Sequence, residues 1–275
     1  MKKRLRRWLA LFLVLAALAA DSRLRLVTRE YTLTPDALPA GFEGFRIVQL
    51  SDLHGAEFGE GNIRLLRAVA AAQPDRIVLT GDLADKNTDL SVIDTLLQGL
   101  SAIAPVDYVS GNHEWSAGLL PRLEPLFARS GVRWLRNEAE ILEREGDTLW
   151  LAGVEDPNGF RDMEQPDALV QRLREGAPDA CMLLLAHRNY WLERYPALDV
   201  DAVLCGHAHG GVIRLPGLGG LLGSGRTWLP KYTAGVYEGP RYDMLVSRGL
   251  GSSNRIPRFL NNPEIVVVTL RCAAE

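Results

Sequence analysis

Residues 45–55, FRIVQLSDLHG, join a short apolar run to an Asp-x-His motif, and the same arrangement recurs along the chain. The run RIVLT at 76–80 is followed by Gly81-Asp82, and PVDYVS at 105–110 is followed by Gly111-Asn112-His113-Glu114. Apolar runs of this length, bounded by turn residues, are typical of buried strands. We therefore expect a set of strands that each end in polar side chains.

Amphipathic patterns typical of helices lie between these strands, at residues 62–73, 90–103 and 119–130. In the first of them Ile63, Leu66 and Val69 recur at the spacing of one helix face. Alternation of strand and helix favours a largely parallel sheet covered by helices. For residues 105–114 we predict one continuous strand.

The second half of the chain is richer in strand patterns. Residues 133–156 predict short strands with a hairpin tip at 145–147, and residues 167–175 predict a helix. The runs CMLLLAH (181–187) and DAVLCGHAH (201–209) predict two more buried strands. Strand-like pieces that we expect to be antiparallel are residues 231–237, 243–250 and 265–271. One α/β domain with two packed sheets is the most economical architecture.

The first twenty residues form a separate segment, in which the basic stretch KKRLRR precedes an uncharged run from Trp8 to Ala20. This run is shorter than the about 20 apolar residues that a bilayer-spanning helix needs. It fits a signal sequence or membrane anchor. Cations ahead of the run favour the extracytoplasmic side for the rest of the chain, although Arg23, Arg25 and Arg29 weaken that orientation. We expect association with the cell membrane, or export.

The domain division that follows has three parts. Residues 1–20 are the signal sequence or anchor, 21–44 are a connecting strand and loop, and 45–272 are the main α/β domain. Within the connection, apolar and polar residues alternate in RLRLVTREYTLT (23–34), which is typical of an edge strand, and Pro35 ends the pattern.

Composition excludes some classes of protein. The chain has 275 residues and a net charge of −3, and without the five cations of residues 2–7 the net charge is −8. An acidic folded part has no basic surface for a nucleic acid polymer, which we therefore do not expect as a partner. The three cysteines predict no disulfide framework, and no Cys-x-x-Cys spacing supports Cys205 as a metal ligand.

All five histidines of the chain lie in motifs at predicted strand ends, and Asp52 and Asp82 lie in motifs of the same kind. Histidine is the commonest metal ligand, and aspartate is a hard oxygen donor. The carboxyl ends of the parallel strands in an α/β sheet lie at one edge, where loops from several strands converge. The sequence therefore predicts a divalent-metal site spread over five strand ends, against the alternative of unrelated turn residues and core histidines.

The order D-x-H, G-D, G-N-H-E, H, G-H-A-H resembles the calcineurin-like metallophosphoesterase superfamily. The segments QLSDLHG, IVLTGDLAD, VSGNHEW, LLLAHRN, GHAHGGVIRLPGLG, SRGLG and NNPEI resemble its YkuE-like subgroup of membrane-associated phosphoesterases. The resemblance extends from Phe42 to Leu270. It implies a four-layer α/β/β/α sandwich of two mixed sheets that holds two divalent metal ions.

The resemblance also implies roles for individual residues. The first metal would be held by Asp52, His54 and His209, the second by Asn112, His187 and His207, with Asp82 bridging both. Such ligands, without thiolate, suit Mn²⁺, Fe or Zn²⁺. The implied reaction is attack of a metal-bridging hydroxide on a phosphate ester or phosphoanhydride.

His113 is matched by the resemblance to a catalytic residue that protonates the leaving oxygen, which an imidazole can do near neutral pH. Asp85 and Glu114 are candidates for orienting the imidazoles, or else solvated surface carboxylates. Two departures from the subgroup pattern, Arg188-Asn189 and Val212, remove no ligand and would alter only the substrate wall.

The subgroup points to a phosphorylated small-molecule or lipid substrate, for example a nucleotide sugar such as UDP-2,3-diacylglucosamine. That reaction needs a cytoplasmic-facing site, opposite to the orientation favoured above. Residues 215–222 are apolar and flexible, and would contact an acyl chain or form a hairpin packed on the core. The alternatives in other classes are a non-enzymatic scaffold with the same fold and a metalloprotease, but no H-E-x-x-H occurs. The sequence predicts no oligomeric state.

Overall fold

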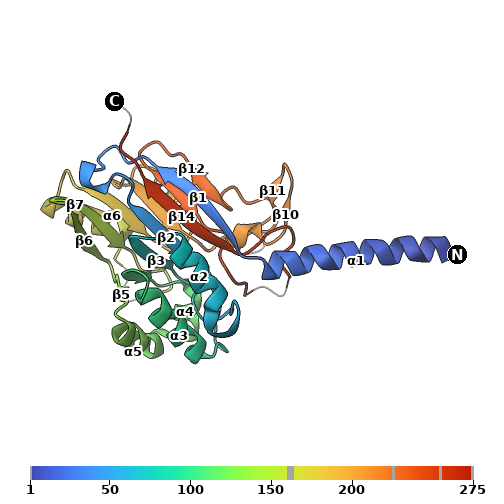
Figure 1. The fold of residues 1–275 in the computed structure, drawn as a ribbon. Coiled ribbons are helices and arrows are strands. Elements are labelled where there is room, and N and C mark those ends of the chain that lie inside the picture. Colours follow the sequence, from blue (N-terminus) through green and yellow to red (C-terminus); the bar gives the residue numbers. More distant parts are fainter. Residues whose placement is uncertain (1, 160–163, 225–226, 254–255, 274–275) are drawn as a thin grey trace.

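Two six-stranded mixed sheets with flanking helices form the body of the protein, as seen in a computed structural model that describes residues 2–159, 164–224, 227–253 and 256–273 (Figure 1). The first sheet has the order β1 (Val27–Leu33), β14 (Glu264–Leu270), β2 (Arg46–Leu50), β3 (Arg76–Thr80), β4 (Val106–Val109) and β5 (Arg133–Trp134). The second has the order β12 (Gly235–Tyr237), β13 (Asp243–Val246), β9 (Ala202–Cys205), β8 (Cys181–Leu185), β7 (Asp147–Gly153) and β6 (Glu138–Arg144).

The helices lie mostly between consecutive strands. They are α1 (Lys2–Leu24), α2 (Ile63–Ala71), α3 (Leu90–Ser101), α4 (Asn112–Ala117), α5 (Leu120–Ser130), α6 (Pro166–Gly176) and α7 (Trp191–Arg194). Short 3₁₀ turns are η1 (Ala40–Phe42), η2 (Glu60–Asn62) and η3 (His209–Gly211), and β10 (Arg214–Leu215) pairs with β11 (Gly219–Gly220) as a small hairpin.

Parallel pairing dominates where the sequence alternates strand and helix. Strands β2, β3, β4 and β5 are parallel to one another, and so are β7, β8, β9 and β13. Their apolar runs are continuous because both faces of each strand are covered. The predicted parallel sheet is therefore confirmed, and a second, mostly parallel sheet lies beside it.

Apolar side chains form three clusters that define the packing. One cluster draws on both sheets, for example Ile47 and Val78 of the first with Leu151 and Leu183 of the second. The outer face of the first sheet packs on helices α2, α3 and α5, and the outer face of the second packs on α6 and α7. Because side chains alternate along a strand, neighbouring residues such as Ile47 and Val48 belong to different clusters.

One prediction of local structure is wrong, and another is confirmed only in part. Residues 105–114 do not form one strand, because β4 ends at Val109 and helix α4 begins at Asn112. The extended Gly111 caps this helix, and Glu114 in its first turn accepts a hydrogen bond from the Gly111 amide. The C-terminal strands are antiparallel only in part: β12 is antiparallel to β13 and β14 to β2, but β13 runs parallel to β9 and β14 runs parallel to β1.

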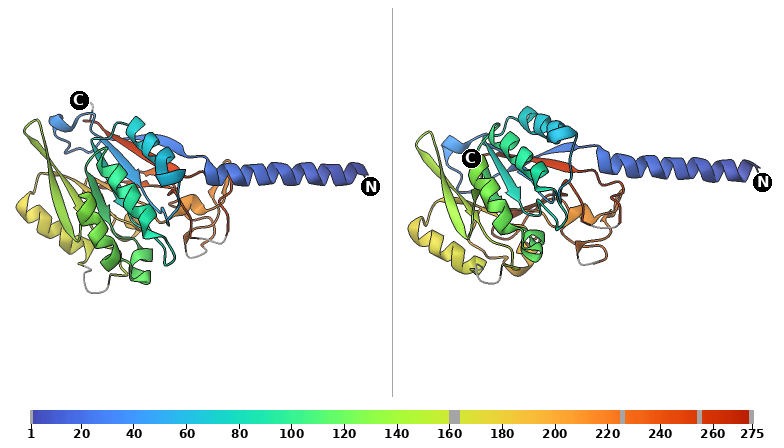
Figure 2. Two further views of the ribbon diagram at one scale, coloured as in Figure 1. Left: turned by 60° about the horizontal axis from the view of Figure 1, so that its bottom comes forward. Right: turned by 90° about the horizontal axis from the view of Figure 1, so that it is seen from below.

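Helix α1 projects from the body at one end of the molecule (Figure 2). Its apolar side chains are exposed, including Trp8 at 65% and Phe12 at 66%. Near its end the backbone carbonyl of Asp21 accepts a hydrogen bond from Asn262, and β1 then enters the sheet as the predicted edge strand. Of the helices that the structure describes, none combines the length and the apolar character needed to cross a membrane.

The packing between the sheets predicts a strong effect for Leu151→Ala. Leu151 is fully buried in the cluster shared by both sheets, and the cavity left by such a change typically costs about 2–5 kcal/mol. Ile141→Ala, in the neighbouring strand β6, is the control because Ile141 is 47% exposed. The free energy of unfolding in urea measures both. An equal loss of unfolding free energy in the two variants would show that burial of Leu151 in this cluster does not stabilise the protein as predicted.

Candidate metal centre

The predicted ligand residues and the predicted catalytic residue His113 all follow parallel strands. Asp52 and His54 follow β2, Asp82 follows β3, and Asn112 and His113 follow β4, while His187 follows β8 and His207 and His209 follow β9. The carboxyl ends of parallel strands lie at one edge of a sheet. The two sheets therefore bring these side chains together at a common edge.

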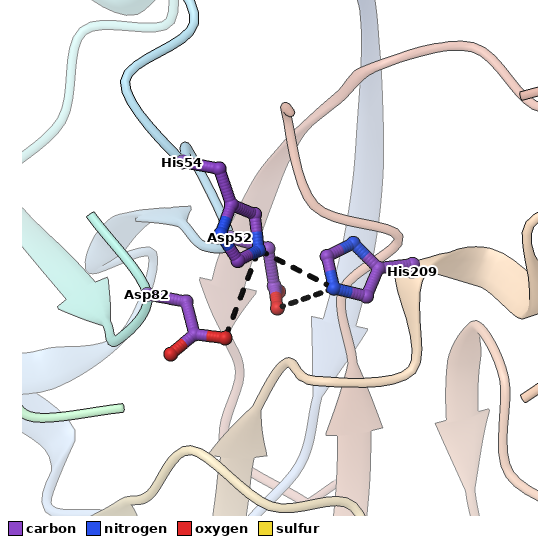
Figure 3. A group of neighbouring side chains, drawn as sticks. All are labelled: Asp52, His54, Asp82 and His209. Carbon is purple, nitrogen blue, oxygen red and sulfur yellow. Dashed lines mark hydrogen bonds and ion pairs between the residues drawn. The ribbon is translucent and has the colours of Figure 1, made fainter. Parts of the chain in front are cut away.

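Four of the side chains form a first group: Asp52, His54, Asp82 and His209 (Figure 3). His54 Nε2 lies 3.4 Å from His209 Nε2 and 3.7 Å from Asp82 Oδ2, and His209 Nε2 lies 3.5 Å from Asp52 Oδ1. His54 Nδ1 faces the Asp85 carboxylate at 3.0 Å, so this nitrogen carries the proton. The lone pair of Nε2 is then left to face the group.

A second group, Asp82, His187 and His207, shares Asp82 with the first. His187 Nδ1 donates to the carbonyl oxygen of Thr80 at 2.9 Å. Nε2 of the same ring lies 3.1 Å from Asn112 Oδ1, 3.2 Å from Asp82 Oδ2 and 3.1 Å from His207 Nδ1. Asn112 thus joins this group through its side-chain oxygen.

The chemistry of these donor atoms fits metal ions. Acceptor atoms that converge in a buried space repel one another unless a cation lies among them. In the described part of the chain, Asp82 Oδ2 is a buried oxygen that accepts no hydrogen bond, although three histidines surround it. The imidazole, carboxylate and amide atoms of both groups could therefore hold divalent ions, with Asp82 common to the two.

The electrostatics of the two groups also favour a bound metal cation. Burial alone would raise the pKa of Asp82, but His187, His54 and His113 outweigh it and hold this pKa below its usual value. Burial lowers the pKa of His187, but Asp82 and Asp52 outweigh that effect and raise it to about 10. A field that favours a proton on His187 this strongly also favours a metal cation in the same place.

His207 and His209 are held neutral. Burial lowers the pKa of both well below its usual value, and the neighbouring cationic groups add to this effect. A neutral imidazole keeps a lone pair for a metal. Both residues are therefore in the protonation state that a ligand requires.

Asp82 is oriented by the start of helix α4. Its Oδ1 accepts a hydrogen bond from the His113 amide at 2.9 Å, which turns Oδ2 toward the histidines. Glu114 is fully buried, and its carboxylate accepts hydrogen bonds from the amides of Asp82, Leu83, Ala84 and Gly111. Glu114 thus joins the loop after β3 to the start of α4, and it positions backbone rather than imidazoles.

His113 and Asp85 lie on the more exposed side of the site. The side chain of His113 is 34% exposed and that of Asp85 is 30% exposed. Asp85 Oδ1 lies 2.6 Å from His113 Nδ1 and 3.0 Å from His54 Nδ1, so one carboxylate orients both rings. The hydrogen bond from His113 to Asp85 raises the pKa of His113. Asp85 therefore has the orienting contacts expected from the sequence.

Backbone strain is concentrated at these residues. Non-glycine residues with a left-handed backbone are uncommon, and each costs about 1–3 kcal/mol. Five candidate ligands adopt it: Asp52, His54, Asp82, His207 and His209, with φ between 48° and 66°. Such strain persists only where the surrounding structure imposes it, and it is typical of functional sites.

Several supporting residues were not singled out from the sequence. Gly251 donates its amide to the Asp52 carbonyl at 2.7 Å, and the Asn261 side chain donates to the His209 carbonyl at 2.8 Å. Buried Arg258 donates to the Gly251 carbonyl, which secures the same loop. These residues lie in or near SRGLG and NNPEI, whose glycines and asparagines were the available signal. Cys205 is buried near Leu245, and burial raises its pKa well above the usual value, as expected of a residue that is not a ligand.

Comparison with known proteins shows the family of this chain. The profile of the calcineurin-like phosphoesterase family matches residues 45–211. The chain is 31% identical over 252 residues to the uncharacterized metallophosphoesterase YkuE of Bacillus subtilis, covering 89% of this chain and 85% of that protein. An uncharacterized metallophosphoesterase of Aquifex aeolicus is 31% identical over 253 residues, covering 90% and 92%. Phosphodiesterase YaeI of Escherichia coli is 27% identical over 237 residues, covering 82% of each chain.

The chain belongs to the calcineurin-like phosphoesterase family. It is therefore a metal-dependent phosphoester hydrolase, and not the non-enzymatic scaffold that the sequence left as an alternative. The grouped aspartates and histidines support divalent metal binding.

The close approach of the loops predicts that Gly111→Ala weakens metal binding. A Cβ at Gly111 would overlap Oδ1 and the amide nitrogen of Asp82, so the shared carboxylate must move. Metal content after dialysis, measured by mass spectrometry, should fall well below that of the wild type.

Gly176→Ala is the matched control for this change. A Cβ at Gly176 would have only Trp150 at 3.9 Å as a neighbour. Its metal content should equal that of the wild type. Full metal content in Gly111→Ala would mean that Asp82 is not needed in its present position.

Proposed function

We propose that this protein hydrolyses a phosphate ester or phosphoanhydride at a centre of two divalent metal ions. The observation that carries the proposal is the convergence of acceptor atoms from both groups on Asp82 Oδ2. The proposed ligands are Asp52, His54 and His209 for one ion, Asn112, His187 and His207 for the other, and Asp82 for both. Oxygen and imidazole donors without thiolate suit Mn²⁺, Fe or Zn²⁺.

When bound, the ions would polarise the phosphate and supply a hydroxide nucleophile near neutral pH. The protein holds the ligand side chains in place. Asp85 and the Thr80 carbonyl fix the protons on His54 Nδ1 and His187 Nδ1, so that each Nε2 faces inward. Ser51 donates to Asp52 at 2.6 Å, and the His207 amide donates to both oxygens of the same carboxylate.

His113 is the proposed proton donor to the leaving oxygen. Its Nε2 lies 4.0 Å from Asp82 Oδ2, and its ring edge is partly open to solvent, where a leaving group can depart. Asp85 holds Nδ1, so that Nε2 is the nitrogen available for transfer. In this proposal the histidine acts beside the centre and is not one of its ligands.

The finer description of the fold is also a proposal. The three apolar clusters support a four-layer α/β/β/α sandwich, with one cluster between the sheets and one under each layer of helices. We further propose the division into segment 1–20, connection 21–44 and catalytic domain 45–272.

The exposed apolar side chains support membrane association and a lipid-linked substrate. Outside residues 2–23, those of the described residues are Leu24, Ile63, Leu218, Trp228, Leu229 and Ile256, which we call the apolar collar, and Ile141. Contacts connect several of the collar segments. Arg64 donates to the Leu24 carbonyl, and a bridge between Ile213 and Phe259 ties the β10–β11 hairpin to the segment after Ile256.

A cavity of about 500 Å³ opens at the end of α1, beside the loop that carries His54. It is lined by Leu24, Phe58 and Ile256, by the cations Arg23 and Arg64, and by His54. Mixed apolar and cationic walls suit an amphiphilic phosphate. We therefore propose lipid-linked phosphates, including UDP-2,3-diacylglucosamine, as substrates to test, with the N-terminus associated with the membrane. The cations that precede the apolar run favour the extracytoplasmic side, whereas cleavage of UDP-2,3-diacylglucosamine requires a site that faces the cytoplasm.

Residues 215–222, for which the sequence suggested lipid contact or a packed hairpin, form part of the β10–β11 hairpin beside the base of α1 (Figures 1 and 2). The hairpin packs closely on the turn after His209, since a Cβ at Gly211 would meet Gly220 Cα at 2.5 Å. Leu218 at its tip is 66% exposed. This segment therefore combines packing on the core with one apolar side chain available to a bilayer.

The role of His113 predicts a dependence on the leaving group. His113→Ala should lower kcat for an alkyl phosphate by about 10²–10⁴-fold, because an alkoxide needs a proton to depart. The loss for p-nitrophenyl phosphate should be much smaller, since p-nitrophenolate leaves without one. Both rates are measured with Mn²⁺ added, and chelation of the metal should abolish both. Equal losses on the two substrates, at unchanged metal content, would refute the proton-donor role.

The apolar collar predicts binding to lipid vesicles. Trp228→Ser with Leu229→Ser should lower the fraction of full-length protein that sediments with anionic phospholipid vesicles by about tenfold, because two large apolar side chains are lost from the contact. Ile141→Ser is the control, since Ile141 lies in β6, at the other end of the molecule from α1 (Figure 1). Equal partition of the two variants would contradict docking through the collar.

A further inference from the structure

The guanidinium group of Arg188 lies beside the metal centre, in the residue directly after His187. Its Nη1 is 3.5 Å from His207 Nε2, and its side chain is only 22% exposed. Like charges repel, so a cation held next to a centre that binds divalent cations is unfavourable by itself. The position of Arg188 therefore requires anionic partners.

Asp156 is one such partner. Its side chain is fully buried, and its two oxygens accept hydrogen bonds from Arg188 Nε at 2.6 Å and Nη2 at 3.1 Å. The Asn158 amide donates to the same carboxylate at 2.9 Å. Such a two-point contact fixes the plane of the guanidinium group. It leaves Nη1 as the nitrogen that is not committed to Asp156.

His207 does not accept a hydrogen bond from Arg188 Nη1 when it serves as a metal ligand. Its Nδ1 is the atom that faces His187 Nε2, at 3.1 Å. A neutral imidazole that gives the lone pair of Nδ1 to a metal carries its proton on Nε2, and cannot then accept from Arg188. The N–H groups of Nη1 are therefore free to bind an anion at the edge of the centre.

We propose that Arg188 binds a phosphate oxygen of the substrate, as a donor that Asp156 holds in place. This inference rests on the proposed function and adds a residue that determines affinity for the phosphate group. Arginine is well suited to the role, because its planar donors match phosphate oxygens and its charge does not depend on pH in the working range. The charge of Asp156 offsets that of Arg188 until the anion arrives.

The test is binding of inorganic phosphate to the metal-loaded, full-length protein, measured by calorimetry. Arg188→Ala should weaken phosphate binding by about 10–100-fold, the range for a hydrogen bond to a charged group. KM for a phosphate ester should rise with it, while metal content stays as in the wild type. A role limited to positioning His207 would instead lower metal content or kcat and leave phosphate affinity unchanged.

Arg194→Ala is the matched control. Arg194 and Arg188 both line a pocket separate from the cavity at the base of α1, but Arg194 is exposed and lies over the Tyr190 ring at 4.3 Å. Loss of an exposed cation has little effect, so its phosphate affinity should stay close to that of the wild type. An equal loss in both variants would overturn the proposal, because a general effect of charge would explain it.

The double variant Arg188→Gln with Asp156→Asn tests the same role without the risk that an unpaired Asp156 unfolds the protein. It removes both charges and leaves no buried carboxylate without a partner. Its phosphate affinity should fall as in Arg188→Ala. Wild-type affinity in the double variant would overturn the role of Arg188 while the hydrolase activity stands. A wild-type protein that binds metal but neither binds phosphate nor hydrolyses any ester would overturn the proposed function as well.

Discussion

The structure depends on a single electrostatic constraint, the gathering of lone pairs around the Asp82 carboxylate. His54 and His187 come from loops of different sheets, and each has the proton on its outer nitrogen fixed by an oxygen acceptor. Their inner nitrogens and Asp82 Oδ2 face one another in a buried space. Only a cation makes that arrangement favourable, so the fold around it is organised for metal binding.

Much of the surrounding structure holds this arrangement in place. Glu114 connects the loop after β3 to the start of α4 through four backbone amides. Gly111 and Gly206 allow backbone to approach Asp82 and Asp52 more closely than any side chain would permit. The left-handed backbone at five candidate ligands is the strain that remains. Rigid packing of both sheets can sustain that strain, whereas an isolated loop could not.

Charged and apolar residues are distributed unevenly around the site. The acidic and imidazole groups lie at the strand ends, while Arg23, Arg64, Leu24 and Ile256 line the cavity at the base of α1. Arg188 lines a separate pocket and is held by Asp156. In the proposed function, the first cavity would meet the apolar part of the substrate and Arg188 its phosphate.

The sequence alone indicated the strands that carry the site, the eight candidate residues and the family resemblance, because short motifs after apolar runs are local features. It also predicted that β2, β3 and β4 are parallel, from the helices between them. It could not show that residues 112–117 form a helix, because the hydrogen bonds of Glu114 to a distant loop stabilise that turn. Tertiary structure likewise decided three other features. They are the parallel pairing of β13 with β9, the contact of Asp85 with two histidines and the two-point hydrogen bond between Arg188 and Asp156. Each joins residues far apart in the chain, and only the packing of the two sheets sets their distances.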